Sequence, residues 1–534
     1  MSHVVEDAAG RPSPDGGLRE RREMLEAPEP PPAPQPAPAL LPPPWPVPVH
    51  DPQEWELAAR YAPILLLDER EPFEPEVVGY RVFRRGGPSP SFPREIQLAA
   101  GGAPETAGAA GGGEPAACAV EYAIWWDWDI EHLYELEHVW VYVDAGGRVV
   151  RVEASWHGGW HDLRLGAAGG VALEETHPLV YVKPGKHALA ARPADFAPVR
   201  DMVNVQCGRL AGSGGVWVTP LFAGRLTCKT PVADRLVHTY LQRHQFTPAW
   251  RFERRFVIGR EHLLPWEALE AAIPGRVAWW TVELARLIPP EQRRWLRVGH
   301  RGASGHVTEN SASGFRLAAR LGADMVELDV RITRDGVPVV IHDEMLDRVT
   351  TGRGRVADRT WEELRPLRLR NTRTGEPMDE GLMTFADALA LCREEAIGAY
   401  VDIKDSAAIP AVVAAIREHF PPHAVIVGSN RAEDVRTLRQ LAPELPAAWL
   451  VGLPPRDLAH LLAELEELGG TYLHLCWENA GPRPDQLLTR ADVELVHRAG
   501  KGVVCWHEER PDVIAGLRQL GVDAVCSDLP ELLV

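Results

Sequence analysis

The feature that most constrains the fold is a series of nine short strand-like runs over residues 297–534, most of them separated by helical stretches. The runs are Arg297–His300, Met325–Val330, Val337–His342, Ala399–Lys404, Ala424–Gly428, Ala447–Val451, Tyr472–Cys476, Gly502–Trp506 and Ala524–Ser527. Roughly 240 residues of repeated β–α units are typical of a (β/α)₈ TIM barrel. We therefore predict an α/β barrel for residues 297–534.

Nine runs exceed the eight strands of such a barrel, and the second and third runs account for the excess. Only residues 331–336 separate them, which is too few for a parallel crossover. An Asp-Gly pair in this connection is a hairpin turn signal. A two-residue loop of Arg334 and Asp335 would place Glu327 opposite His342 across the hairpin.

Three carboxylates lie on strand-like runs of the predicted barrel. Glu327 and Asp329 are two residues apart, so both side chains leave the same face of one strand. Asp402 lies on another run and supplies a third oxygen ligand in this prediction. Acids in an apolar barrel interior need a cation or a proton, and oxygen ligands favour Mg²⁺ or Ca²⁺. The open alternative is that each acid is solvated at a strand end.

Imidazole and basic side chains follow the ends of the same strands, where barrel active sites gather. His300 closes the first run and His342 the third, and two histidines suit paired general acid and base catalysis. Arg301 offers a planar fork for a phosphate. Lys404 is one of five lysines in a chain with 52 arginines, and its ammonium suits a metal-bound phosphate.

The remaining chain divides into three further parts. Residues 1–50 are predicted to be a disordered proline-rich tail, because 12 of the 21 positions from 28 to 48 are proline. Residues 51–260 hold strand-like runs, with a hairpin signature at 137–156, and predict an all-β sandwich-like domain. Residues 261–296 have helical spacing and predict a connector. We therefore expect a multidomain protein.

Composition limits the location and the partners. A net charge of −18, from 57 basic and 75 acidic residues, argues against a nucleic-acid partner. No apolar run is long enough for a transmembrane segment, and the amino terminus lacks the pattern of a signal peptide. Seven dispersed cysteines favour reduced thiols. We expect a cytoplasmic protein; peripheral membrane contact and the oligomeric state stay open.

Residues 297–534 resemble the glycerophosphodiester phosphodiesterases of the phosphatidylinositol-phospholipase-C-like superfamily. The matching pieces, in order, are His300-Arg301-Gly302, Glu309-Asn310, Val326–Val330, Thr333–Gly336, Ile341-His342-Asp343, Asp402-Ile403-Lys404, Trp506, Gly521–Ala524 and Ser527-Asp528. As an ordered set these pieces are specific, although each alone is common.

The resemblance implies an irregular TIM barrel and a metal-dependent phosphodiesterase. It implies His300 and His342 as the acid and base, the three acids named above as metal ligands, and Arg301 and Lys404 as phosphate contacts. Glu309 and Trp506 would line the mouth of the site. The sequence departs from the family pattern at Asp402, where a Glu is usual, at Thr308, where a Pro is usual, and at His507, where a Thr is usual.

The amino-terminal region resembles, more weakly, the vacuolar protein sorting family 62. The similar segments are Tyr61–Glu69, Glu135–Val139, Trp156–Gly159 and Lys186–Ala188, and the Gly-Asp-Trp of the family's usual motif is missing. In this region of the chain, the candidate residues for binding a metal or a polar ligand are Glu137, His138, His157 and His187. A hydrogen-bonded histidine cluster that supports strand ends is the alternative.

The resulting hypothesis is an enzyme of lipid metabolism that hydrolyses glycerophosphodiesters to glycerol 3-phosphate and an alcohol. One alternative is lysophospholipase-D-like cleavage of a lysolipid. Another is a non-catalytic protein that binds its ligand through the amino-terminal domain. All three take a small-molecule partner, and the first two need a divalent metal.

Overall fold

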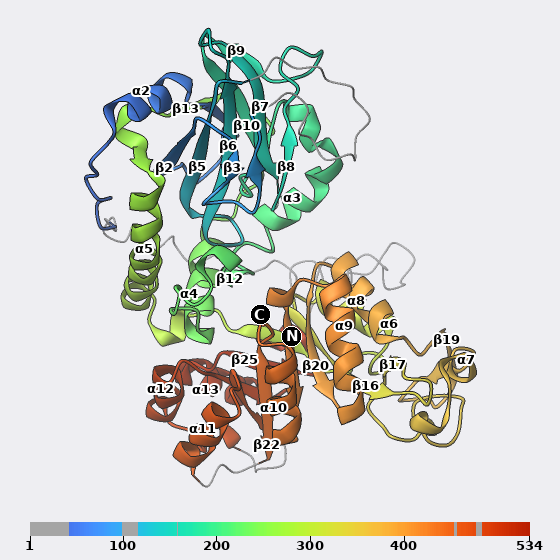
Figure 1. Ribbon diagram of the computed structural model, residues 1–534. Coiled ribbons are helices and arrows are strands. Elements are labelled where there is room, and N and C mark those ends of the chain that lie inside the picture. The colour runs from blue at the N-terminus through green and yellow to red at the C-terminus, as the bar shows by residue number, and fades with distance from the viewer. Residues whose placement is uncertain (1–41, 99–115, 157, 453–456, 477–482) are drawn as a thin grey trace, which may run out of the picture. The chain divides into compact units, whose positions relative to one another are not determined.

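The computed structural model describes residues 42–98, 116–156, 158–452, 457–476 and 483–534 (Figure 1). The predicted tail therefore lies outside the described residues up to position 41. Residues 42–50 contain no helix or strand, yet Trp45 sets its ring edge against Trp125 at 6.3 Å. The guanidinium of Arg276 lies 4.2 Å from the centre of the Trp45 ring. This segment is thus anchored to the amino-terminal half of the protein.

Two mixed β-sheets form that half. The larger has the order β14-β2-β5-β6-β7-β8, with β12 beside β6, and the smaller has the order β11-β10-β1-β13, with β9 beside β10. The strands are β1 (Ile64–Leu67), β2 (Val77–Phe83), β5 (Cys118–Trp128), β6 (His132–Val143), β7 (Val149–Trp156), β8 (Gly159–Asp162), β9 (Ala172–Glu174), β10 (His177–Val182), β11 (Leu189–Ala190), β12 (Gly215–Val216), β13 (Arg254–Val257) and β14 (Leu263–Pro265). A short pair, β3 (Gly87–Pro88) and β4 (Glu95–Ile96), stands apart. The predicted hairpin is confirmed by the antiparallel pairing of β6 with β7.

Helices also occur in this half, where the sequence predicted only strands before residue 261. They are α2 (Pro52–Tyr61), α3 (Arg200–Cys207) and α4 (Pro231–Gln242), followed by α5 (Trp266–Leu287) in the predicted connector. The start of α4 is readable from sequence, because Thr230 caps the helix by accepting from the amide of Ala233 and a proline follows it. The sequence on both sides of α4 alternates between apolar and polar residues as a strand does, and this pattern obscured the helix signal.

Eight parallel strands of the carboxyl-terminal half close into a barrel, as predicted (Figure 1). Their order is β15-β25-β24-β23-β22-β21-β20-β16, and β15 pairs with β16 to close the ring. The strands are β15 (Leu296–Gly299), β16 (Met325–Ile332), β20 (Gly398–Ile403), β21 (Val425–Ser429), β22 (Ala447–Gly452), β23 (Tyr472–Cys476), β24 (Gly502–Trp506) and β25 (Ala524–Ser527). Because the strands are parallel, their carboxyl ends all lie at one rim of the barrel. The predicted site residues are at or near these ends.

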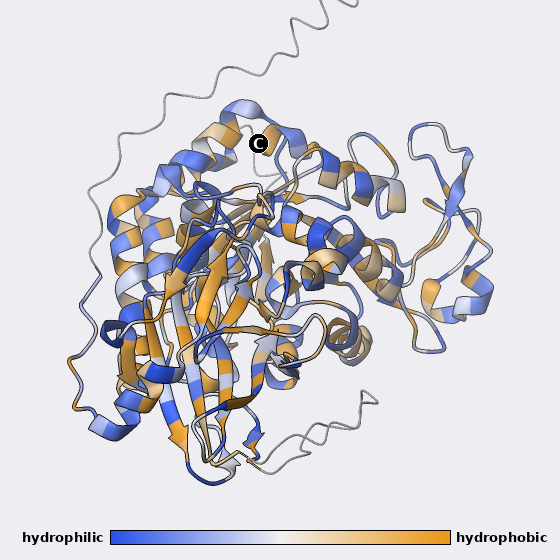
Figure 2. Ribbon diagram, turned by 90° about the horizontal axis from the view of Figure 1, so that it is seen from above, coloured by the Kyte–Doolittle hydropathy of each residue, from blue (hydrophilic) through white to orange (hydrophobic). Residues whose placement is uncertain are grey.

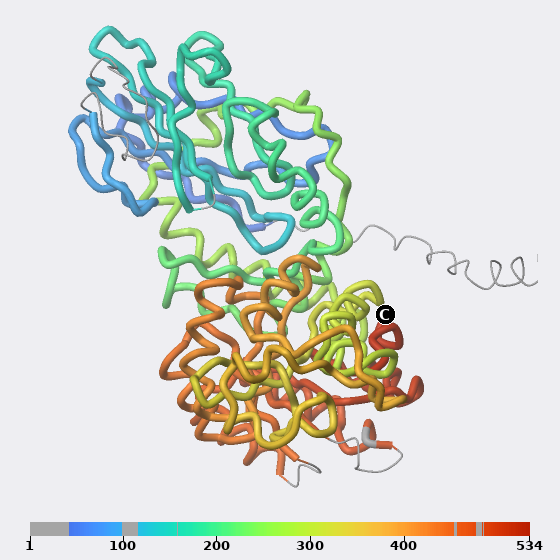
Figure 3. The backbone as a smooth tube through the Cα atoms, turned by 90° about the vertical axis from the view of Figure 1, so that its right-hand side faces the viewer, coloured from blue at the N-terminus to red at the C-terminus, as the bar shows by residue number. Residues whose placement is uncertain are grey.

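Helices follow the barrel strands on the outside of the ring. They are α6 (Ala312–Arg320), α8 (Phe385–Glu394), α9 (Ile409–His419), α10 (Ala432–Leu441), α11 (Leu458–Glu467), α12 (Arg490–Arg498) and α13 (Pro511–Leu520). The chain ends in a 3-10 turn, η9 (Pro530–Leu533), which lies beside the start of the barrel (Figure 3). There the indole nitrogen of Trp295 donates to the carbonyl of Leu533 at 3.1 Å.

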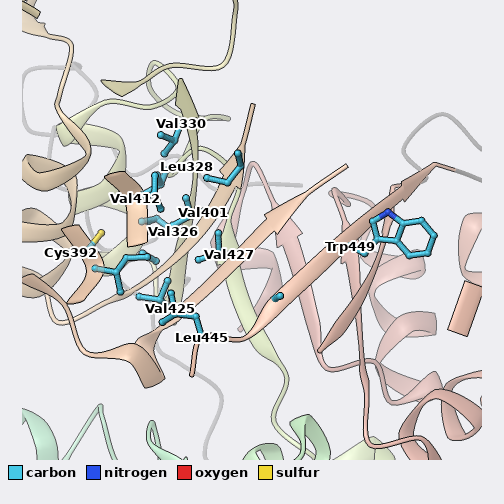
Figure 4. Packing of buried hydrophobic residues seen from close by; sticks show 14 of the residues in the cluster. Val326, Leu328, Val330, Cys392, Val401, Val412, Val425, Val427, Leu445 and Trp449 are labelled. Atoms are coloured by element: carbon cyan, nitrogen blue, oxygen red, sulfur yellow. The ribbon is translucent and has the colours of Figure 1, made fainter. Parts of the chain in front are cut away.

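The main core lies between the barrel strands and these helices. Val326, Leu328 and Val330 point outward from β16 into this layer, among side chains from α8, α9 and β21 (Figure 4). Burying each such side chain contributes roughly 1.5–3 kcal/mol. Because neighbouring residues alternate in direction, Glu327 and Asp329 point into the barrel. Figure 2 shows apolar residues concentrated on strands and polar residues on many helices and loops.

The antiparallel partner of β16 is β17 (Pro338–Val340), which confirms the predicted hairpin but not its register. Arg331 pairs with Val339, and the amide of Ile341 donates to the carbonyl of Asp329 at 3.0 Å. The prediction that Glu327 faces His342 is therefore wrong by one residue. The reason is a three-residue loop closed by Gly336 at φ +83°, a left-handed conformation that glycine adopts easily.

An insertion over residues 341–384 lies between β17 and α8. It contains α7 (Trp361–Leu364) and the pair β18 (Arg368–Arg370) and β19 (Pro377–Gly381), around a small apolar cluster of its own. Among the described residues, no helix is both long and apolar enough to span a membrane.

Candidate active site

The three predicted acids come together inside the barrel. Glu327 and Asp329 lie on β16, and Asp402 lies on β20, where it pairs directly with Asp329 in the parallel register. All three side chains are buried, and one ligand atom from each lies within 4.8 Å of the others. The shorter Asp402 therefore still reaches the group, although a glutamate is usual there.

Cations and an amide surround these acids. The ammonium of Lys404 donates to Asp402 at 2.6 Å and lies 3.0 Å from Asp329. The side-chain amide of Asn310 donates to Asp329 at 2.8 Å, and the backbone amide of Arg301 donates to Glu327 at 2.8 Å. These contacts fix the direction of each carboxylate within the barrel mouth.

The charge of the cluster is only partly balanced. Burial raises the pKa of Glu327 well above its usual range, and the nearby Asp329 raises it further. Burial also raises the pKa of Asp402. At Asp329, burial is outweighed by Lys404 and Arg301, which lower its pKa to about 2.

The donor set fits a hard divalent cation. Three carboxylates supply oxygen ligands, and among the described residues Oε1 of Glu327 is buried without a hydrogen-bond partner. An orphaned buried oxygen is costly unless an ion or a proton satisfies it. Glu327, Asp329 and Asp402 are thus arranged as a metal site would require.

His300 stands at the end of β15 beside this group. Its Nδ1 is 2.7 Å from Oδ1 of Asp528, and its Nε2 is 4.0 Å from Oε2 of Glu327. The hydroxyl of Ser304 donates to the same Asp528 oxygen at 2.7 Å. With Nδ1 bound to a carboxylate, Nε2 is the nitrogen left to accept a proton. Burial lowers the pKa of His300 and favours this neutral form.

The turn after His300 depends on unusual backbone conformations. Arg301 and Gly302 have φ values of +53° and +90°. A Cβ on Gly302 would lie 2.8 Å from the carbonyl carbon of Gly314, so only glycine fits there. This turn directs the Arg301 amide to Glu327 and its side chain to Glu309, whose Oε1 accepts from the guanidinium at 3.0 Å.

His342 belongs to a chain of paired charges on the other side of the mouth. Its Nδ1 is 2.8 Å from Asp343, which accepts from Arg348 at 2.6 Å. Arg348 also donates to Glu309 at 2.7 and 2.8 Å, so the network continues to Arg301. A protonated His342 is close enough to Asp329 and Asp402 to lower the pKa of both acids.

A pocket of about 300 Å³ opens at this rim. Its lining residues are His300, Arg301, Ser304, Glu309, Arg348, Thr372, His507 and Asp528. Arg348 and Thr372 come from the insertion, and neither residue gave a sequence signal for a role at the site. Asp528 and His507 follow the last two strands, so the rule that sites gather at strand ends could have found them.

His507 and Trp506 form one wall of the site. The ring of His507 stacks on His300, with centres 4.8 Å apart and planes 13° apart, and its Nδ1 is 2.9 Å from Glu509. Trp506 lies 5.5 Å from His300, and the ammonium of Lys404 lies 5.8 Å from the Trp506 ring centre. The predicted mouth residue Trp506 thus lies beside both His300 and Lys404, the lysine that contacts the acid cluster.

Below Trp506, the barrel interior holds a buried pair that sequence reasoning missed. The hydroxyl of Tyr400 lies 2.6 Å from Nδ1 of His474, and the His474 ring meets Trp506 edge-on at 4.9 Å. Burial lowers the pKa of His474 to about 3. A neutral imidazole therefore supports the tryptophan from beneath.

Residues 300–532 match the family described as "Glycerophosphoryl diester phosphodiesterase family". The glycerophosphodiester phosphodiesterase of Caldanaerobacter subterraneus subsp. tengcongensis is 31% identical over 245 residues, which are 45% of this chain and 96% of that protein. The chain belongs to the glycerophosphoryl diester phosphodiesterase family. This membership confirms the predicted enzyme class and agrees with the closed barrel.

Other members of the glycerophosphoryl diester phosphodiesterase family are similar over part of the chain. The human glycerophosphodiester phosphodiesterase 1 is 40% identical over 116 residues, 21% of this chain and 34% of that protein. A solved structure of a phosphodiesterase from Oleispira antarctica, in complex with the product sn-glycerol-3-phosphate, has 25% identity and a TM-score of 0.40. It covers 46% of this chain and 95% of its own.

The amino-terminal candidates lie outside the region that matches the phosphodiesterase family. Glu137 and His138 are neighbours on β6 and point to opposite faces. Glu137 accepts from the hydroxyl of Ser155, and burial raises its pKa to about 7. His138 lies 2.9 Å from the hydroxyl of Ser91.

The other two candidates are His187, which is close enough to Glu137 to lower the pKa of that acid, and His157. His187 is buried with its ring stacked on Trp126 at 4.6 Å, and its Nε2 lies 3.4 Å from Glu71. His157 lies outside the described residues. The resemblance of this region to the vacuolar protein sorting family 62 stays a prediction.

Proposed function

We propose that the barrel catalyses the metal-dependent hydrolysis of glycerophosphodiesters to glycerol 3-phosphate and an alcohol, as a step of lipid metabolism. One observation carries this proposal. His300 lines a pocket of about 300 Å³, with its Nε2 only 4.0 Å from a buried carboxylate of the three-acid cluster. A base and a cation site side by side suit the attack of a hydroxyl on a phosphodiester.

Glu327, Asp329 and Asp402 would hold Mg²⁺ or Ca²⁺, which would neutralise the negative charge of the bound phosphodiester. Arg301 and Lys404 would contact the phosphate oxygens as well. Both basic side chains are held by acids of the site, at 3.0 Å from Glu309 and 2.6 Å from Asp402 respectively. Such fixed charges stabilise a transition state because they need little reorganisation when the reaction occurs.

The two histidines would move the protons. Nε2 of His300 takes the proton of the attacking hydroxyl, which belongs to water or to the glycerol group of the substrate. Asp528 holds the opposite nitrogen at 2.7 Å and stabilises the imidazolium that forms. His342, paired with Asp343 at 2.8 Å, gives a proton to the leaving alcohol.

Glu309 and Trp506 would act as supports at the mouth. Glu309 accepts from Arg348 at 2.7 and 2.8 Å as well as from Arg301, so it keeps both guanidinium groups at the pocket wall. Trp506 covers the side of His300 next to Lys404. Both residues would limit which alcohol groups enter.

The test is an assay of the purified full chain on glycerophosphocholine and on lysophosphatidylcholine, with and without EDTA. We expect release of glycerol 3-phosphate from the first substrate and loss of that release with EDTA. His300→Ala and His342→Ala should each lower kcat by about 10²–10⁴-fold, while His419→Ala on the surface of α9 should not. Full activity in either of the first two variants would rule out the assignment. A preference for lysophosphatidylcholine would favour the lysolipid alternative.

A further inference from the structure

A second group of buried charges lies in the amino-terminal half, far in sequence from the barrel residues. We call it the β6 cluster. It consists of four acids and two lysines around one histidine: Asp129, Glu131, His132, Glu135, Glu137, Lys183 and Lys186. Two of the five lysines of the chain thus lie in this cluster, although most basic residues of the protein are arginines.

Three members of the β6 cluster place ligand atoms within 4.8 Å of one another: Asp129, His132 and Glu135. Nε2 of His132 lies 3.6 Å from Oδ1 of Asp129 and 3.8 Å from Oε2 of Glu135. The opposite nitrogen, Nδ1, lies 2.9 Å from the backbone carbonyl of Tyr134. That bond fixes the ring so that Nε2 faces the two carboxylates.

Ordinary strand geometry would separate His132 from Glu135. Residues three apart on a strand point to opposite faces. Tyr134 between them has a φ of +62°, which breaks the alternation. Its ring is buried in a stack with Trp125, with centres 4.8 Å apart. Left-handed backbone at a tyrosine is strained and persists where the surrounding structure requires it.

An oxygen in this group lacks a partner. Among the described residues, Oδ2 of Asp129 is buried with no hydrogen bond, and the Asp129 side chain is fully inaccessible to solvent. An unpaired carboxylate oxygen in such a position is costly unless a cation or a bound donor reaches it. The orphaned oxygen belongs to the acid whose other oxygen, Oδ1, lies 3.6 Å from Nε2 of His132.

The acids of the β6 cluster also outnumber its lysines. Four carboxyl groups lie with two lysines in a region where Asp129, Glu137, Lys183 and Lys186 are all buried. Lys186 binds Asp129 at 2.6 Å and Glu131 at 3.0 Å, and lies 3.4 Å from Nε2 of His132. A dication would offset the excess of carboxyl groups, and Lys186 would keep Glu131 as its partner.

We propose that Asp129, His132 and Glu135 are ligands of a second metal site, for a divalent first-row transition metal such as Mn²⁺ or Zn²⁺. One imidazole nitrogen with two carboxylate oxygens distinguishes this site from the all-oxygen group of the barrel and shifts its preference toward such metals. The proposal is independent of the reaction proposed for the barrel.

The test uses full-length Glu327→Gln/Asp329→Asn, in which the barrel group has lost two carboxylates. We expect this variant to bind one equivalent of Mn²⁺ in a titration followed by electron paramagnetic resonance, and one of Zn²⁺ by equilibrium dialysis. Adding His132→Gln should weaken both affinities by more than about tenfold. His138→Gln is the matched control, because His138 is a buried histidine of β6 whose Nε2 lies 2.9 Å from the hydroxyl of Ser91.

Two results would overturn the site. One is a barrel-deficient variant that binds neither metal, and the other is equal metal binding by the His132→Gln and His138→Gln variants. If the double variant does not fold, native mass spectrometry of otherwise unaltered chains gives the same comparison. We then expect one metal ion fewer on His132→Gln than on His138→Gln, and equal counts would contradict the proposal.

A lysine variant separates a metal site from a purely structural ion pair. Lys186→Met removes the ammonium that competes for Asp129 and should lower Tm when no metal is present. If a dication replaces the lost charge, Mn²⁺ should restore Tm by several degrees, because a ligand that binds only the folded state stabilises it. The rescue should vanish when His132→Gln is added. A Tm of Lys186→Met that does not respond to Mn²⁺ or Zn²⁺ would show that Lys186 is itself the permanent cation.

Discussion

Nδ1 of His300 lies 2.7 Å from Oδ1 of Asp528, although the two residues are 228 positions apart in the sequence. The barrel makes this contact because β15 and β25 are neighbours, with Gly299 paired to Ser527. His300 and Asp528 directly follow that pair. The first and last strands of the barrel therefore meet at the proposed base of the reaction.

Asp528→Asn should lower kcat by about 10²-fold or more with little change in KM. An asparagine at this position can donate to Nδ1 and so favours the wrong tautomer, in which Nε2 carries the proton and cannot accept one. Steady-state kinetics on glycerophosphocholine will measure the effect. Asp512→Asn, at an exposed position on α13, is the control and should behave as the unaltered chain. Normal turnover in Asp528→Asn would mean that His300 is not the base.

Glu327→Gln should abolish tight binding of Mg²⁺ or Ca²⁺ to the barrel and the activity that depends on it. The same change should preserve or raise the Tm of the EDTA-treated protein at pH 8, because it removes one of three crowded carboxylates. Asp402→Glu, which restores the usual family residue, should still bind the metal. Metal analysis and thermal unfolding together provide the test, and tight metal binding by Glu327→Gln would contradict the site.

His507→Thr should move the acidic limb of the kcat/KM profile to higher pH. Burial lowers the pKa of His300, and a protonated His507 ring stacked at 4.8 Å lowers it further. Removing that ring allows His300 to hold its proton at a higher pH, so the active neutral form appears later. His306→Gln, at a surface histidine paired with Glu531, is the matched control. Superimposable pH profiles for the two variants would show that His507 has no effect on the pKa of His300.

His474→Asn should make the protein less sensitive to acid. In the folded state His474 has a pKa of about 3, whereas an unfolded chain binds its proton near pH 6.5. Below pH 6.5 the unfolded state therefore gains a proton that the folded state does not. Each pH unit between 6.5 and about 3 then costs about 1.4 kcal/mol of the free energy of unfolding.

Urea unfolding at pH 7.5, 6.0 and 4.5 measures this dependence. Asparagine keeps an acceptor for the hydroxyl of Tyr400, which lies 2.6 Å from His474 in the unaltered protein. The slope of stability against pH should therefore fall by about one proton in His474→Asn. An unchanged slope would show that the buried imidazole is not the group that titrates.

Much of the barrel could be predicted from local patterns. The nine strand-like runs correspond to eight barrel strands and the antiparallel β17. The period of two along a strand correctly predicted that Glu327 and Asp329 share a face, because each side chain alternates with an apolar neighbour such as Leu328. Asp402 followed from its place on a neighbouring run.

The hairpin register escaped prediction, and so did the contacts of the amino-terminal half. Loop length sets register, and only the pairing of Ile332 with Pro338 and the bond from the Thr333 amide to the Val337 carbonyl show that the loop has three residues. Likewise, the left-handed backbone of Tyr134 brings His132 beside Glu135, whereas the sequence suggested Glu137 and His138. A single backbone angle changes which side chains meet, and composition does not encode that angle locally.

The sequence by itself determined the alternation of strands and helices, the direction of the acids on β16 and the strand ends that carry His300 and Lys404. These depend on periods of two and 3.6 residues, which nearby side chains fix. Only the tertiary structure decided that Asp528 holds His300, that Arg348 and Thr372 line the pocket, and that Asp129 lies with His132 and Glu135. Those contacts arise from ring closure, an inserted segment and backbone turns, which bring together residues whose spacing in the chain carries no information about distance in space.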